Sequence, residues 1–391
     1  MAGRKVVCCL LFLFSLGFSE TLEEVLSFAV ENSPTLKALQ AERLLIEGKR
    51  LSYRSNLNPE LSVEFGNFGT SKESYTKSPL YHIGYNQPLP LYGILKKADS
   101  LYRAEEKAFK YRFEAQKRQL IAEIYRLFYR ALYKKELLEL SKEALNFQKE
   151  LFNFVERSYR LGEASKLEFL KAKREYQMAV SSFELAKAEY EASLKELSSL
   201  VGKDIKDVEG SFQIPHLKEL KETPFLSYYE EINKAIGKEL QIEKALSMPQ
   251  VSVSLVAEKV ADREYGLRVG ISSTLPFFYK RQGEVLNLLS KREVLMAEKE
   301  NYLRRLEYEV KAIKLKLEEI KKQLDKIDTE LLPEAKQELE LALKSYRLRV
   351  ITLPELYLTR QSYQELLKKR LELLLMAHEE KAKYVELGGL P

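Results

Sequence analysis

Two stretches of the chain place a hydroxyl residue three positions before a glutamate at the start of a helical segment. Ser165 precedes Glu168 in the first stretch, and Thr352 precedes Glu355 in the second. This spacing is typical of a capping box, in which the hydroxyl accepts from a free backbone N–H and the glutamate reaches back to the cap. The chemistry open to these residues is therefore stabilisation of a helix start, with a carboxylate held there.

Both capping sequences belong to a longer stretch that the chain carries twice. Residues 158–170 read SYRLGEASKLEFL, and residues 345–357 read SYRLRVITLPELY. Each copy lies between two long segments of helical periodicity, so each is interpreted as the tip of a helical hairpin. The copies differ most clearly where Arg349 stands at the position of Gly162.

No residue pattern supports catalysis. The histidines His82, His216 and His378 are far apart with no cysteine beside them, which does not suit a metal site. Neither a nucleophile elbow nor a phosphate-binding glycine loop is present. We therefore expect a protein that is not an enzyme and uses no cofactor or resident metal. The histidines are interpreted as residues of a surface or of an aqueous lumen.

Composition predicts a mainly helical protein. The 391 residues are 31% charged and 45% hydrophobic, with only 16 glycines, 12 prolines and no tryptophan. The 64 basic and 58 acidic residues alternate along the helical segments instead of clustering by sign. Binding of nucleic acid is therefore not expected, since that function needs a concentrated basic face.

Residues 1–19 are predicted to be a signal peptide. Arg4 and Lys5 precede an apolar run of about nine residues, and the small Ser19 precedes the expected cut before Glu20. An uncleaved helical anchor is the alternative. Cleavage would remove Cys8 and Cys9, the only cysteines, and leave a mature chain without a disulfide.

The mature chain is predicted to consist of two structural repeats, at residues 20–205 and 206–391. Each repeat contains a strand pair, expected within residues 59–89 and 249–275, because apolar residues there alternate with polar ones. Each repeat also contains one helical hairpin, with tips near residues 162 and 349. The helices repeat their apolar residues every 3.5 positions, which predicts coiled-coil packing.

Four strands per chain are too few to close a barrel. An open sheet edge has no hydrogen-bond partner in hydrocarbon, so membrane-spanning strands would require several chains to share one barrel. Three chains would supply about twelve strands, within the range of outer-membrane barrels. The residues that alternate with the apolar strand positions suit a water-filled lumen: Ser62, Glu64, Gly84, Asn86, Ser252, Ser254, Arg268 and Gly270. A soluble hairpin with one wet face is the alternative.

The chain resembles the TolC-type outer-membrane efflux proteins over nearly its whole mature length. The resemblance depends on the opening at residues 22–34, the two strand pairs, the Pro88–Gly93 turn and the paired tips. It implies a mainly α fold with a membrane β-barrel portion. Duplicated helical hairpins would form a coiled-coil tunnel, and four strands per chain would join a shared twelve-strand barrel of a homotrimer.

The same resemblance implies an outer-membrane duct of a tripartite efflux or type I secretion system. The barrel would lie in the outer membrane of a double-membraned bacterium, with a long periplasmic portion and contact with outer-membrane lipid. Its partners would be a periplasmic adaptor and an inner-membrane pump. A periplasmic coiled-coil adaptor or tether without a pore is the alternative. The compact length and the segment 87–90 favour the metal-cation efflux branch.

Residue roles also follow from the resemblance. Glu168 and Glu355 match acidic positions at the closed periplasmic end, where rings of carboxylates would favour cations. Tyr346 matches a tyrosine that helps to hold that end shut. Ile351 stands where some members carry a gating arginine. Either Arg347 or Arg349 takes that role, or the lock differs in this chain.

The hairpin tips are also candidate docking positions for the adaptor. The residues expected to meet it are Leu161, Gly162, Ala164, Leu348 and Val350. Packing between neighbouring hairpins is the alternative role for them.

Overall fold

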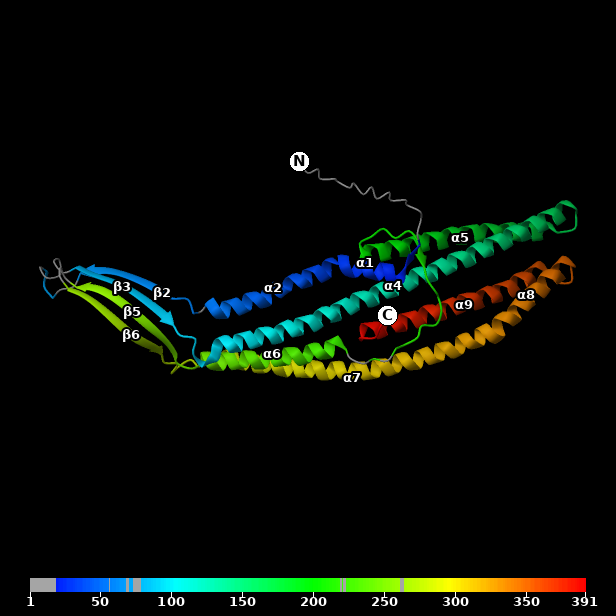
Figure 1. The fold of residues 1–391 in the computed structure, drawn as a ribbon. Helices are drawn as coiled ribbons and strands as arrows, with labels where there is room; N and C mark the ends of the chain where they lie inside the picture. The colour runs from blue at the N-terminus through cyan, green and yellow to red at the C-terminus, as the bar shows by residue number, and fades with distance from the viewer. Residues whose placement is uncertain are drawn as a thin grey trace, which may run out of the picture. The chain divides into compact units, whose positions relative to one another are not determined.

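The computed structural model describes residues 19–55, 57–67, 70–72, 79–218, 220, 223–260 and 264–391. All but Ser19 of the expected signal peptide lies outside the described residues. In chain order the first elements are β1 (Glu20–Thr21), α1 (Leu22–Asn32), α2 (Pro34–Ser55), β2 (Glu60–Asn67), β3 (Pro79–Pro88), α4 (Ile94–Arg160), α5 (Lys166–Val201) and β4 (Val208–Glu209). The later elements are α6 (Pro224–Leu246), β5 (Gln250–Val260), β6 (Glu264–Thr274), α7 (Gln282–Lys326), α8 (Leu332–Arg347) and α9 (Leu353–Glu386) (Figure 1).

The chain divides into two compact units that take segments from both predicted repeats. Unit 1 comprises residues 1–33, 117–219 and 309–391, and unit 2 comprises residues 34–116 and 220–308. The division into units therefore follows packing across the repeats, and the boundaries of the repeats themselves stay a prediction.

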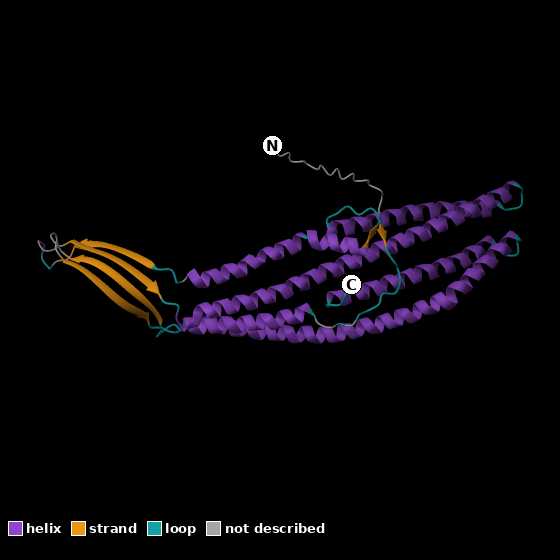
Figure 2. Cartoon of the chain, in the orientation of Figure 1, coloured by secondary structure: helices purple, strands orange, loops and turns teal. Residues whose placement is uncertain are grey.

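Unit 2 contains a four-stranded antiparallel sheet in the order β2-β3-β5-β6 (Figure 2). The central pair, β3 and β5, joins the two expected strand pairs, with Tyr85 opposite Leu255. The register aligns apolar residues across all four strands, as in the row formed by Leu61, Tyr85, Leu255 and Val269.

The two faces of this sheet differ sharply in polarity. One face carries Lys259 and many large apolar side chains, and these apolar side chains are 43% to 79% exposed. They are Leu61, Val63, Phe65, Tyr81, Ile83, Tyr85, Leu255, Tyr265, Leu267, Val269 and Ile271. The other face carries the polar and small residues predicted to line a lumen, including Arg268, which pairs with Glu258 at 2.6 Å. Exposed apolar residues of this extent mark an interaction surface.

Two matching turns lead from the strands into the long helices of unit 2. In the first, Leu91 N–H donates to Leu89 O at 2.8 Å, and in the second Phe277 N–H donates to Leu275 O at 2.9 Å. Tyr92 and Arg281 then adopt positive φ angles of 56° and 55°. The helices pack through a core that includes Leu101 of α4 and Ile242 of α6.

Unit 1 is built from two helical hairpins, α4–α5 and α8–α9, together with α1 and the β1–β4 pair (Figure 1). One core joins α1, α4 and α5 around Val25, Phe128 and Leu197, all of them fully buried. A second core joins the hairpins near their tips, and a third packs α7 against α9 around Leu324 and Leu374.

A π-helical segment, Ile327–Leu331, separates α7 from α8. Pro333 follows in the first turn of α8. Proline has no N–H to donate to the preceding turn, and the wider π turn accommodates this loss. The long helical run through α7 and α8 is thus interrupted by a π segment just before Pro333. Among the described helices, none is both long and apolar enough to cross a membrane.

We expect Val269→Arg to prevent stable membrane insertion, because a cationic side chain facing lipid costs about 2–4 kcal/mol at the bilayer midplane. Ser254→Arg is the matched control, since Ser254 lies on the opposite face of the neighbouring strand. The measurement is the fraction of each variant recovered as folded protein in the outer-membrane fraction. Equal recovery of both variants would show that the apolar face does not meet lipid.

Candidate functional site

The two hairpin tips have the same backbone hydrogen bonds although their sequences differ. In the first tip Gly162 N–H donates to Tyr159 O at 3.0 Å, and in the second Arg349 N–H donates to Tyr346 O at 3.0 Å. Both residues have left-handed backbones, with φ of 74° for Gly162 and 59° for Arg349. A left-handed backbone costs a non-glycine residue roughly 1–2 kcal/mol. Arg349 therefore occupies a position where the backbone of a glycine would be less strained.

Both expected capping boxes are present at the helix starts that follow the tips. Glu168 N–H donates to Ser165 Oγ at 3.2 Å, and Ser165 N–H donates to Glu168 Oε2 at 3.0 Å. At the start of α9, Thr352 N–H donates to Glu355 Oε2 at 2.7 Å. Hydrogen bonds from the backbone and hydroxyl of Thr352 lower the pKa of the Glu355 carboxyl, so it stays ionised at neutral pH.

Arg349 joins the two tips. Its Nη2 donates to Glu163 Oε2 at 3.0 Å, and its Nη1 donates to the Glu163 carbonyl oxygen. Both side chains are more than half exposed, so the pair contributes little to overall stability, about 0–1 kcal/mol. What the pair adds is a specific connection between the first and second hairpins at their ends.

Tyr346 lies in the core directly behind these tips. It is 8% exposed and packs with Leu353 and Leu356, and its ring meets Phe154 edge-on at 6.1 Å between centroids. Burial, with a further effect from the Glu168 carboxylate, raises the pKa of Tyr346 to about 12. The fold therefore brings Tyr346, Glu168 and Arg349 close together from two hairpins, and their role at a gate stays a prediction.

The expected docking residues are mostly exposed at the tips. Leu161, Leu348 and Val350 are 72% to 76% exposed, and Gly162 is also exposed. Ala164 differs, because it is half-buried and packs against the core behind the tips. Ala164 is therefore less accessible than the other four residues, and its contact with an adaptor stays a prediction.

Arg347 points to a different environment from Arg349. It lines a cavity of about 610 Å³ between α4 and α8, together with Arg157 and Glu150 of α4. Arg349, not Arg347, makes the contact between the tips. Sequence reasoning missed Glu163, although its position one residue after Gly162 in the duplicated stretch was a usable signal.

The interpretation of His378 as a surface or lumen residue is wrong. It is 2% exposed, and its ring stacks at 3.5 Å on Tyr129. Its Nδ1 lies 2.7 Å from the Tyr125 hydroxyl oxygen. Burial lowers the pKa of His378 to about 3, so the ring is neutral and serves as a packed aromatic group.

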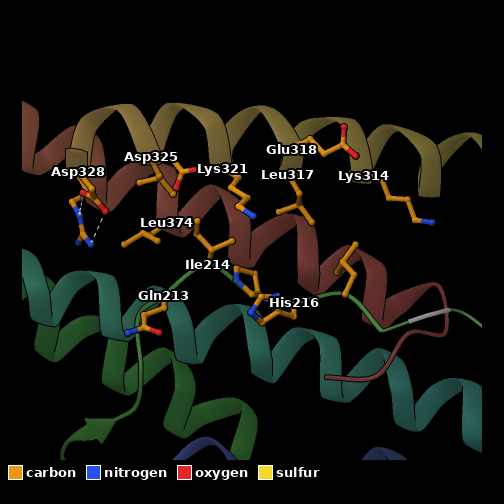
Figure 3. Close-up of a pocket in the computed structure, with 14 residues that line it drawn as sticks. Gln213, Ile214, His216, Lys314, Leu317, Glu318, Lys321, Asp325, Asp328 and Leu374 are labelled. Carbon is orange, nitrogen blue, oxygen red and sulfur yellow. Dashed lines mark hydrogen bonds and ion pairs between the residues drawn. The ribbon is translucent and has the colours of Figure 1, made fainter. Parts of the chain in front are cut away.

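His216 borders a second cavity, of about 580 Å³ (Figure 3). The segment 213–217 forms one side of this cavity, and α7 and α9 form the other. The charged side chains that line this cavity are of both signs. Among them, Arg370 donates to both carboxylate oxygens of Asp328, at 2.7 and 3.3 Å. Within the described residues, no group of His, Cys, Asp or Glu side chains could hold a metal ion.

Comparison with known proteins finds one similar family. A sequence model of the family described as "Outer membrane efflux protein" matches residues 25–203. This match covers somewhat less than half of the chain, and it supports an outer-membrane efflux channel over an adaptor or tether. No curated protein matches the sequence of this chain.

Solved structures share the fold of this chain at low sequence identity. CusC has a TM-score of 0.77 and 15% identity, with 94% of this chain and 92% of that chain covered. VceC from Vibrio cholerae has a TM-score of 0.75 and 15% identity, with 94% and 96% covered. The open state of MtrE from Neisseria gonorrhoeae has a TM-score of 0.71 and 17% identity, with 94% and 89% covered.

Thr352→Ala should loosen the first turn of α9. Loss of an N-cap hydroxyl typically lowers helix stability by about 1 kcal/mol. The equilibrium constant for local opening should therefore rise about fivefold, and amide exchange should become faster by the same factor. Hydrogen exchange of the amides in residues 353–356 measures this effect. Thr359→Ala is the control, because Thr359 Oγ1 donates within the helix and caps nothing. Equal exchange in the two variants would contradict the capping role.

Proposed function

We propose that three copies of this chain form one efflux duct, with a shared twelve-strand barrel and a helical tunnel. The observation that carries the proposal is the sheet of unit 2. Among the described strands, β2 and β6 each have a neighbour on one side alone, and one face of the sheet is apolar and exposed. Three sheets of four strands would pair these edges and give twelve strands.

The hairpin tips of unit 1 would form the gated periplasmic end of this duct. The proposal is supported by the contact of Arg349 with Glu163, since it ties the two hairpins of one chain together at their ends. Opening would require the hairpins to separate and this contact to break. The contact is exposed and weak, which suits a gate that must open and close.

Arg349→Gly is expected to raise the open fraction of the channel. The substitution removes the guanidinium while placing glycine at a left-handed position, so the tip loses its link without gaining strain. Single-channel recording in planar bilayers measures the open fraction. Glu163→Gln should act in the same direction but less strongly, because the Glu163 carbonyl oxygen still accepts from Arg349.

The double variant and a control make this test specific. Arg349→Gly with Glu163→Gln should open no more than Arg349→Gly alone, because both changes remove one link. Arg160→Ala removes another exposed arginine of the same tip, one that pairs with Glu156 within α4 at 2.8 Å, and should leave gating unchanged. The gate role fails if Arg349→Gly and Arg160→Ala behave alike.

Glu168 and Glu355 would supply rings of negative charge in the trimer. Glutamine also completes a capping box, so Glu355→Gln should preserve the helix start while removing the charge. We expect this variant to weaken block by multivalent cations in the same bilayer recordings. If the blocking constant is unchanged, Glu355 serves as a cap alone.

A periplasmic adaptor and an inner-membrane pump are the proposed partners. The exposed apolar side chains of Leu161, Leu348 and Val350 support docking of another protein at the tips. No metal or drug branch is proposed, because the identities to the solved structures named above lie between 15% and 17%. Selection of substrate would lie with the pump.

A further inference from the structure

Arg360 of α9 carries a buried charge that is not balanced by a neighbouring acid. Its side chain is 6% exposed, and its guanidinium carbon lies 3.5 Å from the centroid of the Phe147 ring. Its Nη2 donates to the Ala144 carbonyl oxygen at 3.1 Å, while its Nη1 has no hydrogen-bond partner. In the described chain no carboxylate forms an ion pair with it.

The charge on Arg360 persists at neutral pH. Burial lowers the pKa of the guanidinium to about 10, and this value still leaves it protonated. A buried cation is costly unless an anion or several hydrogen-bond acceptors balance it. Stacking on Phe147 and one carbonyl bond satisfy only part of this requirement.

A cavity of about 210 Å³ lies beside Arg360. It is lined by α4, α5 and α9, so it brings together residues of both hairpins of unit 1. This volume exceeds that of one solvent molecule several-fold, since a water occupies about 30 Å³ in the liquid. The cavity could therefore contain a small ion with part of its hydration shell.

The polar residues of this cavity suit a negative ion. Arg360 and Lys368 are its two cations, and its one acid, Glu175, pairs with Arg174 at 3.0 Å. The buried Gln148 Oε1 has no hydrogen-bond partner. A rotation of that amide would direct its NH₂ group into the cavity as a donor, and the Ser141 hydroxyl can donate as well.

We propose that this cavity binds a small monovalent anion, such as chloride, beside the guanidinium of Arg360. Of the two cations only Arg360 is buried, since Lys368 is exposed to solvent. One buried positive charge matches one negative charge and disfavours a divalent anion. The ion would connect α4 and α5 of the first hairpin with α9 of the second, so packing between the hairpins would depend on the anion. The site is independent of the contact between Arg349 and Glu163.

The location of the anion is tested by crystallography with bromide. Crystals of the full-length protein grown or soaked in sodium bromide should show an anomalous peak beside the guanidinium of Arg360, and Arg360→Met should abolish it. A water molecule in that position, with no anomalous signal at high bromide concentration, would overturn the proposal.

The dependence on the anion is tested by thermal unfolding of the detergent-solubilised protein. At equal ionic strength, replacing chloride with gluconate, a much larger and more strongly hydrated anion, should lower the unfolding midpoint of the wild type. Gln148→Glu places a carboxylate in the cavity and should abolish this sensitivity. Gln361→Glu makes the same charge change on an exposed position of α9 and should retain it.

Two results would contradict the inference. Equal midpoints of the wild type in chloride, bromide and gluconate would show that the cavity holds water. Stabilisation by phosphate without any effect of chloride or bromide would show that the site does not select a monovalent anion. Gln148→Glu keeps the test decisive even if Arg360→Met fails to fold.

Discussion

The backbone of an edge strand in hydrocarbon must find a hydrogen-bond partner, and this single requirement governs the sheet of this protein. Its four strands present a face of exposed apolar side chains, and β2 and β6 are left at the edges. Each unpaired peptide group in lipid costs several kcal/mol, so an isolated copy of this sheet cannot be stable there. The proposed association of three chains would give both edges a partner.

The helical hairpins of unit 1 combine buried apolar contacts with a charged exposed surface. Their apolar residues are confined to narrow seams, which are the lines of contact between neighbouring helices. Val155, Leu353 and Leu356 are fully buried near the tips, whereas most neighbouring positions carry exposed charge. Stability therefore resides in the seams. The exposed ion pairs along the helices, such as Arg349 with Glu163, contribute little individually.

Arg349 of the second tip has a backbone conformation that glycine adopts more easily than arginine. Arg349 adopts the left-handed backbone that Gly162 adopts in the first tip. Glycine would relieve this strain but could not reach Glu163. Strain retained in this way is common at functional positions. The matching backbone hydrogen bonds of both tips show that the turn geometry itself tolerates either residue.

The sequence by itself determined the long helices, the two strand pairs, the duplicated tips, the capping boxes and the polarity of the two strand faces. These features follow from local periodicity and from hydrogen bonds between residues three or four positions apart. The sequence did not determine the burial of His378 or Ala164, because burial depends on neighbours that are distant in the chain. For the same reason, only the tertiary structure shows that Arg349 contacts Glu163. It also shows that the buried charge of Arg360 lies among α4, α5 and α9 without an acidic partner.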